Sequence, residues 1–180
     1  ESKVGALSVA GRQMVEIMRA VQARRKVLIM DEPTAALGQD DRQRLYKLVE
    51  QLAKSGTSII FISHDLNMVR MVSDRINIMY NGEIIENCDA KMLNKGENQH
   101  PFTEKLAEVF FSDYKDYIST ELPAQDTLSV YHGCVYALQG CPYVEEICYK
   151  ITPPAIDVTS KKIITDETTD RHWIKCWKFL

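Results

Sequence analysis

Apolar residues recur with a helical period in two stretches of the first third of the chain. The first stripe predicts a helix over residues 8–24, with Ser8 as a suitable N-cap, and consists of Met14, Ile17, Met18 and Val21. The second stripe predicts a helix over residues 40–54, closed by Ser55-Gly56, and consists of Leu45, Leu48, Val49 and Leu52. Each helix therefore has one face suited to packing on a core.

Two short apolar runs alternate with these helices. They cover residues 26–31 and 57–63, and neither alternates between polar and apolar positions. Such runs are typical of parallel strands that are covered on both faces. The β-α-β order predicts two parallel strands joined by a right-handed crossover, and hence an α/β fold.

The rest of the chain is divided less clearly. We expect a helix over 66–72, then a hairpin of residues 75–80 and 83–87 about the Asn81-Gly82 turn. A further helix is expected over 101–111, with Pro101 at its first position. Periodicity weakens after that, so the predicted organisation is a first domain over 1–111, a linker over 112–132 and a small Cys-rich module over 133–180.

Composition excludes several classes of protein. Over 180 residues the net charge is −3, and Lys and Arg are scattered apart from Arg24-Arg25-Lys26, which we interpret as a solvated turn. We therefore expect no nucleic-acid partner. No apolar run approaches the ~20 residues of a membrane span, and the polar start has no signal peptide, so we expect a cytosolic chain.

Polar residues stand where each of the two strands ends. Asp31-Glu32 follows the first strand, and Ser63-His64-Asp65 follows the second. Because ligands of open α/β sheets bind beyond the carboxyl ends of the strands, these groups should meet in one crevice. Acidic groups beside a histidine suit Mg²⁺-nucleotide chemistry: Asp31 would hold Mg²⁺, Glu32 would deprotonate the attacking water, and His64 would contact the γ-phosphate. Polar strand ends that merely face water are the alternative.

The order of the motifs is more specific than any one of them. Leu7–Gln13, the segment 26–37 and the segment 59–66 together resemble the signature motif, Walker B strand, D-loop and switch histidine of ATP-binding cassette (ABC) ATPases. The resemblance covers residues 7–87. It implies the C-terminal part of a P-loop NTPase domain, with parallel strands and flanking helices, plus a small Cys-rich extension.

In this family two nucleotide-binding domains enclose two ATP molecules, so a second ABC ATPase subunit is the implied partner. The signature of each domain faces the ATP held by the other, because a helix N-terminus presents free N–H groups to phosphate. The residues that carry this role over to the present chain are Leu7, Ser8, Val9, Ala10, Gly11 and Gln13.

Three departures from the family pattern matter. The 180 residues contain no Gly-x-x-x-x-Gly-Lys-Ser/Thr phosphate loop. We therefore expect negligible ATPase activity from this chain alone, and we expect the loss of neighbouring strands to leave an exposed edge and an apolar face. Val9 and Ala10 stand where the usual signature has glycines; a Leu-Ser-Val start also resembles sugar-importer ATPases. Gly38 stands where the D-loop usually has aspartate.

Four cysteines of the last third form a candidate metal site: Cys134, Cys141, Cys148 and Cys176. Four thiolates fit an iron–sulfur cluster or a Cys₄ zinc site, and seven-residue steps could place local helices around one centre. The tight Cys pair usual for zinc is missing, and free thiols or disulfides remain open. We expect Cys88 to be a core residue, His132 and His172 to lie on the surface, and both tryptophans, Trp173 and Trp177, to be packing anchors.

Residues 100–180 resemble the C-terminal region of oligopeptide and dipeptide importer ATPases and of related nickel importers. The resemblance rests on the segment 100–106, on the cysteine pattern and on Cys176 before Trp177. Some members of that family carry a [4Fe–4S] cluster here, which is the cofactor that the resemblance favours over Zn²⁺.

The sequence therefore predicts part of an energy-coupling subunit of a peptide-type importer. It would use ATP and Mg²⁺, drive membrane permease subunits, and lie peripherally on the cytoplasmic face of the cell membrane. The alternative is a non-catalytic truncated remnant or a metal-binding interaction module of an ABC system. A soluble ABC protein acting on ribosomes or DNA is a weaker third hypothesis, since the basic or inserted segments on which those functions usually rely are not seen.

Overall fold

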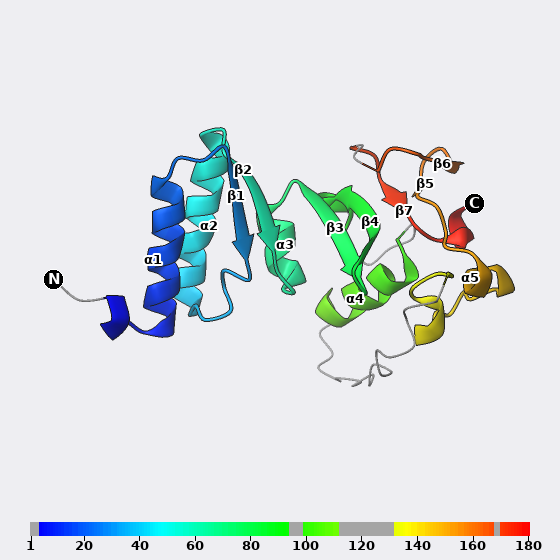
Figure 1. Cartoon of the computed structure of the whole chain (residues 1–180), viewed down its shortest axis with the longest axis horizontal. Coiled ribbons are helices and arrows are strands. Elements are labelled where there is room, and N and C mark those ends of the chain that lie inside the picture. Colours follow the sequence, from blue (N-terminus) through cyan, green and yellow to red (C-terminus); the bar gives the residue numbers. More distant parts are fainter. Residues whose placement is uncertain (1–3, 94–98, 112–131, 168–169) are drawn as a thin grey trace. The chain divides into compact units, whose positions relative to one another are not determined.

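The computed structural model describes residues 4–93, 99–111, 132–167 and 170–180. Its contacts divide the chain into two compact units, Glu1–Ser73 and Asp74–Leu180 (Figure 1). Among the described residues, no helix is long and apolar enough to cross a membrane.

The first unit is a β-α-β arrangement. A short 3₁₀ turn, η1 (Val4–Ala6), precedes α1 (Val9–Gln22), β1 (Val27–Asp31), α2 (Gln39–Lys54), β2 (Ser58–Ile62) and α3 (Leu66–Val72). Strands β1 and β2 pair in parallel, from Val27 opposite Ser58 to Asp31 opposite Ile62. The predicted parallel pairing and the α/β class are thus confirmed, and the helix and strand bounds differ from the expected ones by at most two residues.

Only one face of this two-stranded sheet is covered. Leu28 and Met30 of β1 pack with Leu45 and Val49 of α2, and Met14 of α1 packs against the same core. The opposite face is apolar yet open, with exposed fractions near one half or above for Val27 (52%), Ile29 (63%), Ile60 (51%) and Ile62 (47%). The expectation of strands covered on both faces is therefore wrong within the described unit, because α1 and α2 supply cover on one side only.

The second unit is built on an antiparallel sheet of order β3-β4-β7-β5-β6. Its elements are β3 (Arg75–Tyr80), β4 (Glu83–Asp89), η2 (Ala90–Met92), α4 (Pro101–Phe111), η4 (Ala137–Gln139), α5 (Glu146–Lys150), β5 (Ile156–Asp157), β6 (Lys162–Ile163), β7 (Trp173–Ile174) and η5 (Trp177–Phe179). The hairpin turns at Asn81 (φ 48°) and Gly82 (φ 83°). Two consecutive positive φ values match the right-handed twist of the flanking strands, which explains the Asn-Gly pair.

The sheet crosses the boundary that the sequence pattern suggested. Strand β7 of the C-terminal region pairs with β4 of the hairpin, Glu86 opposite Ile174 and Asn87 opposite Trp173. The buried residues of 133–180 also pack against Tyr80 and Phe102. The C-terminal region thus takes its core from the hairpin and α4, whereas we expected a module appended after a linker; residues 112–131 of that linker lie outside the described residues.

Candidate active site

The end of β1 and the end of β2 meet through the carboxylate of Glu32. The Glu32 backbone N–H donates to the Ile62 carbonyl at 2.9 Å, which extends the strand pairing by one step. Glu32 Oε1 accepts from the backbone N–H of His64 at 3.0 Å and lies 2.9 Å from His64 Nδ1. The side chains that the sequence placed at adjacent strand ends are therefore in direct contact.

Glu32 sits in a constrained backbone conformation. Its φ of 42° lies in the left-handed region, which costs a non-glycine residue on the order of 1 kcal/mol or more. The Ser63 hydroxyl donates to Glu32 Oε2 at 3.4 Å, and the Gln13 side-chain amide donates to the Glu32 carbonyl at 3.1 Å. Contacts from β2 and α1 thus fix both the backbone and the carboxylate of this residue.

The site is open on the side where a ligand would approach. The His64 side chain is 81% exposed, and the Glu32 side chain is 36% exposed. Asp31 is also exposed, and no hydrogen bond or ion pair holds its carboxylate within the described part of the chain. Mg²⁺ at nucleotide sites is typically bound through one or two carboxylates plus phosphate and water, so a single free carboxylate fits that ion.

The expected signature segment forms the start of α1. Ser8 is the N-cap, and its Oγ accepts from the Gly11 backbone N–H at 3.1 Å. A hydroxyl has one donor besides its acceptor lone pairs, so Ser8 can cap the helix and still donate to a ligand. Val9 is 62% exposed, which leaves the branched side chain that departs from the family pattern on the surface.

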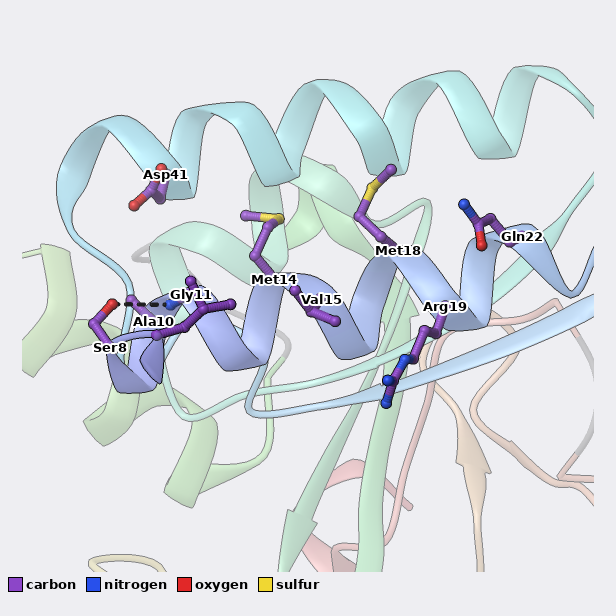
Figure 2. Close-up of a pocket in the computed structure, with 10 residues that line it drawn as sticks. Ser8, Ala10, Gly11, Met14, Val15, Met18, Arg19, Gln22 and Asp41 are labelled. Atoms are coloured by element: carbon purple, nitrogen blue, oxygen red, sulfur yellow. Dashed lines mark hydrogen bonds between the residues drawn. The ribbon is translucent and has the colours of Figure 1, made fainter. Parts of the chain in front are cut away.

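A groove of about 490 Å³ runs along α1 from this turn. Figure 2 shows Ser8 and Gly11 at one end, Met14 and Met18 directed toward α2, and Gln22 at the far end. Its lining also includes Asp41, in the first turn of α2. The N-terminal turn of α1 therefore opens onto solvent-accessible space.

Two further residues support the site: Arg42 of α2, which was not among the expected site residues, and Ser63, which was expected only at the strand end. Arg42 donates from Nε to the Leu37 carbonyl at 3.1 Å and lies 4.0 Å from the Asp65 carboxylate. Ser63 orients Glu32, as described above. The Ser63-His64-Asp65 order placed Ser63 at the strand end, but nothing in the pattern indicated which carboxylate it would contact.

The four cysteines gather in the second unit. The backbone N–H of Cys134 donates to the Cys148 carbonyl at 2.7 Å, and the two residues share one buried cluster that Cys141 packs against. Burial raises the pKa of the Cys134 and Cys141 thiols, and raises that of Cys176 to about 12, with neighbouring thiolates adding to each shift. The thiols are therefore near enough to influence one another.

This arrangement does not fit a metal ion as it stands. Within the described residues, no three His, Cys, Asp or Glu side chains are placed to hold one. Thiols with raised pKa values stay protonated near neutral pH, whereas metal ligands are thiolates. The expectation that local helices would present the ligands is also wrong, because only Cys148 lies within a helix.

Of the remaining expectations for the second unit, some are confirmed and one is wrong. Cys88 is fully buried and Trp173 is 1% exposed, as expected, and His132 is exposed. His172 is a correction: its side chain is 8% exposed and its Nε2 lies 2.9 Å from the buried Glu86 carboxylate. A hydropathy pattern gives no signal for a buried polar pair of residues that lie far apart in the sequence.

No protein-family model matches the sequence. The chain is 48% identical over 122 residues to the L-arabinose transport ATP-binding protein AraG of Geobacillus stearothermophilus, covering 60% of this chain and 24% of that protein. It is 39% identical over 92 residues to the galactose/methyl galactoside import ATP-binding protein MglA of Fusobacterium nucleatum, covering 51% of this chain and 18% of that protein. About half of this chain is similar to the ATP-binding proteins of ABC transporters.

The similarity to ABC transporter proteins covers only part of each relative. The chain spans about a fifth to a quarter of the length of these two relatives, 18% and 24%. Among solved structures, the dimeric structure of a bacterial ABC transporter cassette has a TM-score of 0.47 and 26% identity, covering 50% of this chain and 39% of that one.

Proposed function

We propose that this chain is part of the ATP-binding, energy-coupling subunit of an ABC importer, in which ATP hydrolysis drives transport. The observation that carries the proposal is the contact of Glu32 with His64 across two parallel strand ends, beside the free carboxylate of Asp31. The similarity to ATP-binding proteins of importers supports the same reading.

Glu32 would act as the general base for the attacking water. Its Oε1 is occupied by the two His64 contacts, whereas Oε2 has one longer contact from Ser63. The proton of the attacking water would therefore pass to Oε2, the less engaged oxygen. Asp31 would bind Mg²⁺, which supplies charge neutralisation for the phosphates.

His64 would contact the γ-phosphate through its other ring nitrogen. With Nδ1 placed 2.9 Å from a carboxylate oxygen, Nδ1 carries the hydrogen and Nε2 is the nitrogen free for a ligand. Nε2 can donate to a phosphate oxygen when it also carries a hydrogen.

The start of α1 would serve a second ATP, held by a partner subunit. Its cap leaves the Ser8 hydroxyl donor free, and the N–H groups of the first turn lie at the positive end of the helix dipole. The partner would be another ABC ATPase subunit, the phosphate loop would be supplied outside these 180 residues, and the assembly would act on permease subunits at the cytoplasmic face of the membrane.

Two different parts of the chain favour two different classes of transported solute. The relatives carry names of carbohydrate importers, and the Leu-Ser-Val start agrees with them, so we propose a sugar as the leading candidate. A small peptide is the second candidate, supported by the gathering of four cysteines in the pattern of residues 100–180. ATPase stimulation by sugar-loaded or peptide-loaded binding protein would separate the two.

If the chain belongs to a peptide importer, its four thiols would hold a [4Fe–4S] cluster, with Zn²⁺ as the alternative. Its support is the proximity of the four thiols, and it would need them to rearrange and ionise. Anaerobically purified protein should then contain about four irons per chain, with broad visible absorption that is lost in a Cys134→Ser variant. Protein without iron, sulfide or zinc would remove the cluster and leave the ATPase proposal intact.

The test of the proposed function is ATP turnover by a longer protein that contains this chain and a phosphate loop. Glu32→Gln should lower kcat by at least about 100-fold with little change in ATP binding, because Gln keeps the shape but cannot take a proton. The matched control is Glu50→Gln, at an exposed carboxylate of α2 that pairs only with Lys54. Equal turnover by both variants and the parent would reject Glu32 as the general base, and no turnover by the parent would favour the non-catalytic alternative.

A further inference from the structure

We propose that a buried polar clamp, formed by Glu86 and Arg75, fastens strand β7 and thereby keeps the Cys176 thiol buried. The clamped segment, residues 170–176, is named here the C-terminal strap. The clamp lies outside the candidate ATPase site, and the inference holds whether or not the thiols bind a metal.

Glu86 is the centre of the clamp. Its side chain is fully buried on β4, and its two oxygens reach two distant parts of the chain. Oε1 lies 2.9 Å from Nε2 of His172 in the strap, and Oε2 accepts from the His100 backbone N–H at 2.9 Å. A buried carboxylate is costly unless paired, so this contact strongly favours the docked strap.

Arg75 holds the start of the strap from the neighbouring strand. Its guanidinium donates to the Asp170 carbonyl at 2.6 Å and to the Arg171 carbonyl at 2.8 Å. It also donates to the side chain of Asn87, whose amide in turn donates to Asn77 at 2.6 Å. Because Arg75 binds two successive backbone carbonyls of the strap, these hydrogen bonds fix the position of the strap along β4.

Sheet pairing continues the attachment up to the cysteine. The Lys175 N–H donates to the Ile85 carbonyl at 2.8 Å, and Lys175 Nζ lies 3.2 Å from the Glu83 carboxylate. β7 lies between β4 and β5 in the sheet, visible as the red arrow beside the green hairpin in Figure 1. Cys176 is the next residue, so its position follows from that of the strap.

The other three cysteines are positioned by a different part of the chain. Cys134, Cys141 and Cys148 lie within one stretch of chain, joined by the bond from Cys134 N–H to the Cys148 carbonyl. Cys176 is 7% exposed, so its thiol is shielded from reagents in solution while the strap is docked. Release of the strap would expose this thiol and return it toward ordinary reactivity.

The test is the rate at which iodoacetamide alkylates each cysteine of the native chain, followed by peptide mass spectrometry. Glu86→Gln removes the charge of the clamp and should speed alkylation of Cys176 by at least about tenfold through local opening. Cys88, fully buried with a pKa raised to about 12, should stay protected and reports global unfolding. The control is Glu108→Gln, at an exposed carboxylate of α4 that takes no part in the clamp, which should leave alkylation of Cys176 slow.

Unchanged alkylation of Cys176 in Glu86→Gln, with Cys88 protected, would overturn the proposal. If Glu86→Gln also exposes Cys88, the milder His172→Gln variant decides, because it leaves the Glu86 carboxylate in place and replaces only the imidazole that contacts it. Faster alkylation of Cys176 than of Cys88 in that variant supports the clamp, and equal rates of the two overturn it.

Discussion

Gly38 is the residue at which the chain departs most clearly from the ABC pattern without a structural reason. It is the N-cap of α2 with an extended backbone (φ −71°, ψ 171°), and it makes no side-chain cap. A Cβ placed there would meet no atom within 4 Å. The position therefore accepts a side chain, and a carboxylate would lie at the positive end of the helix.

Gly38→Asp should stabilise the first unit by about 0.5–1 kcal/mol, through a cap hydrogen bond and a less flexible unfolded chain. The gain is limited by repulsion from Asp40 and Asp41 in the first turn of α2. Urea unfolding monitored by circular dichroism measures it, with Gly38→Ala as the control for backbone entropy alone. A less stable Gly38→Asp than Gly38→Ala would contradict this account of the cap.

At the residue scale, pattern reasoning worked where topology determines contacts. Asp31, Glu32 and His64 could be placed together because parallel strands bring their carboxyl ends to one edge. It did not work for His172 and Glu86, which lie 86 residues apart and pair inside the second unit. Neither alternation nor motif spacing encodes such a pair, so the burial of His172 could not be predicted from the pattern of residues.

At the scale of elements, β1 and β2 present an apolar face that nothing in the first unit covers. Non-alternating strands predict cover on both faces, and the structure supplies it on one. An exposed apolar patch of this kind marks an interaction surface or an aggregation liability. The exposure itself could be anticipated from the absence of a phosphate loop in the sequence.

Ile60→Lys should make the isolated chain more soluble while changing its free energy of unfolding by less than about 1 kcal/mol, because the side chain is 51% exposed. Binding of a hydrophobic dye should fall with it. Leu28→Lys, on the covered face at 9% exposure, should instead unfold the first unit. Dye binding that is unaffected by Ile60→Lys would show that the open face is occupied in solution.

The segment before α4 makes the second unit sensitive to acid. Burial lowers the pKa of His100 from 6.5 to about 4, and its Nδ1 accepts from the Phe102 N–H at 3.1 Å. Between pH 6.5 and about 4, His100 therefore binds a proton in the unfolded chain but stays neutral in the folded one. Stability is full above pH 6.5 and falls by up to about 3 kcal/mol as the pH drops to 4. Unfolding at pH 7 and pH 5 should differ less in His100→Gln, and an equal difference would contradict the prediction.

At the scale of the whole molecule, the chain combines two units with separate sequence signals. The first unit carries an ordered set of motifs that resemble those of ABC ATPases, together with clear helical and strand periods, which is why its helices and strands could be predicted closely. The second unit could be predicted only in part, because its short strands β5, β6 and β7 have two residues each and leave no periodicity. Its core also depends on the hairpin, so the boundary we expected near residue 111 does not match the division at Ser73.

The central claim is that this chain serves two ATP molecules, one through Glu32 and one through the start of α1. The most direct test is the ATP-dependent association of a longer protein that contains this chain and a phosphate loop, measured by light scattering during gel filtration. With Glu32→Gln, MgATP should trap a stable dimer that the parent protein does not retain, and adding Ser8→Arg should abolish it. A Glu32→Gln protein that stays monomeric with ATP while turning it over at the parent rate would contradict the account.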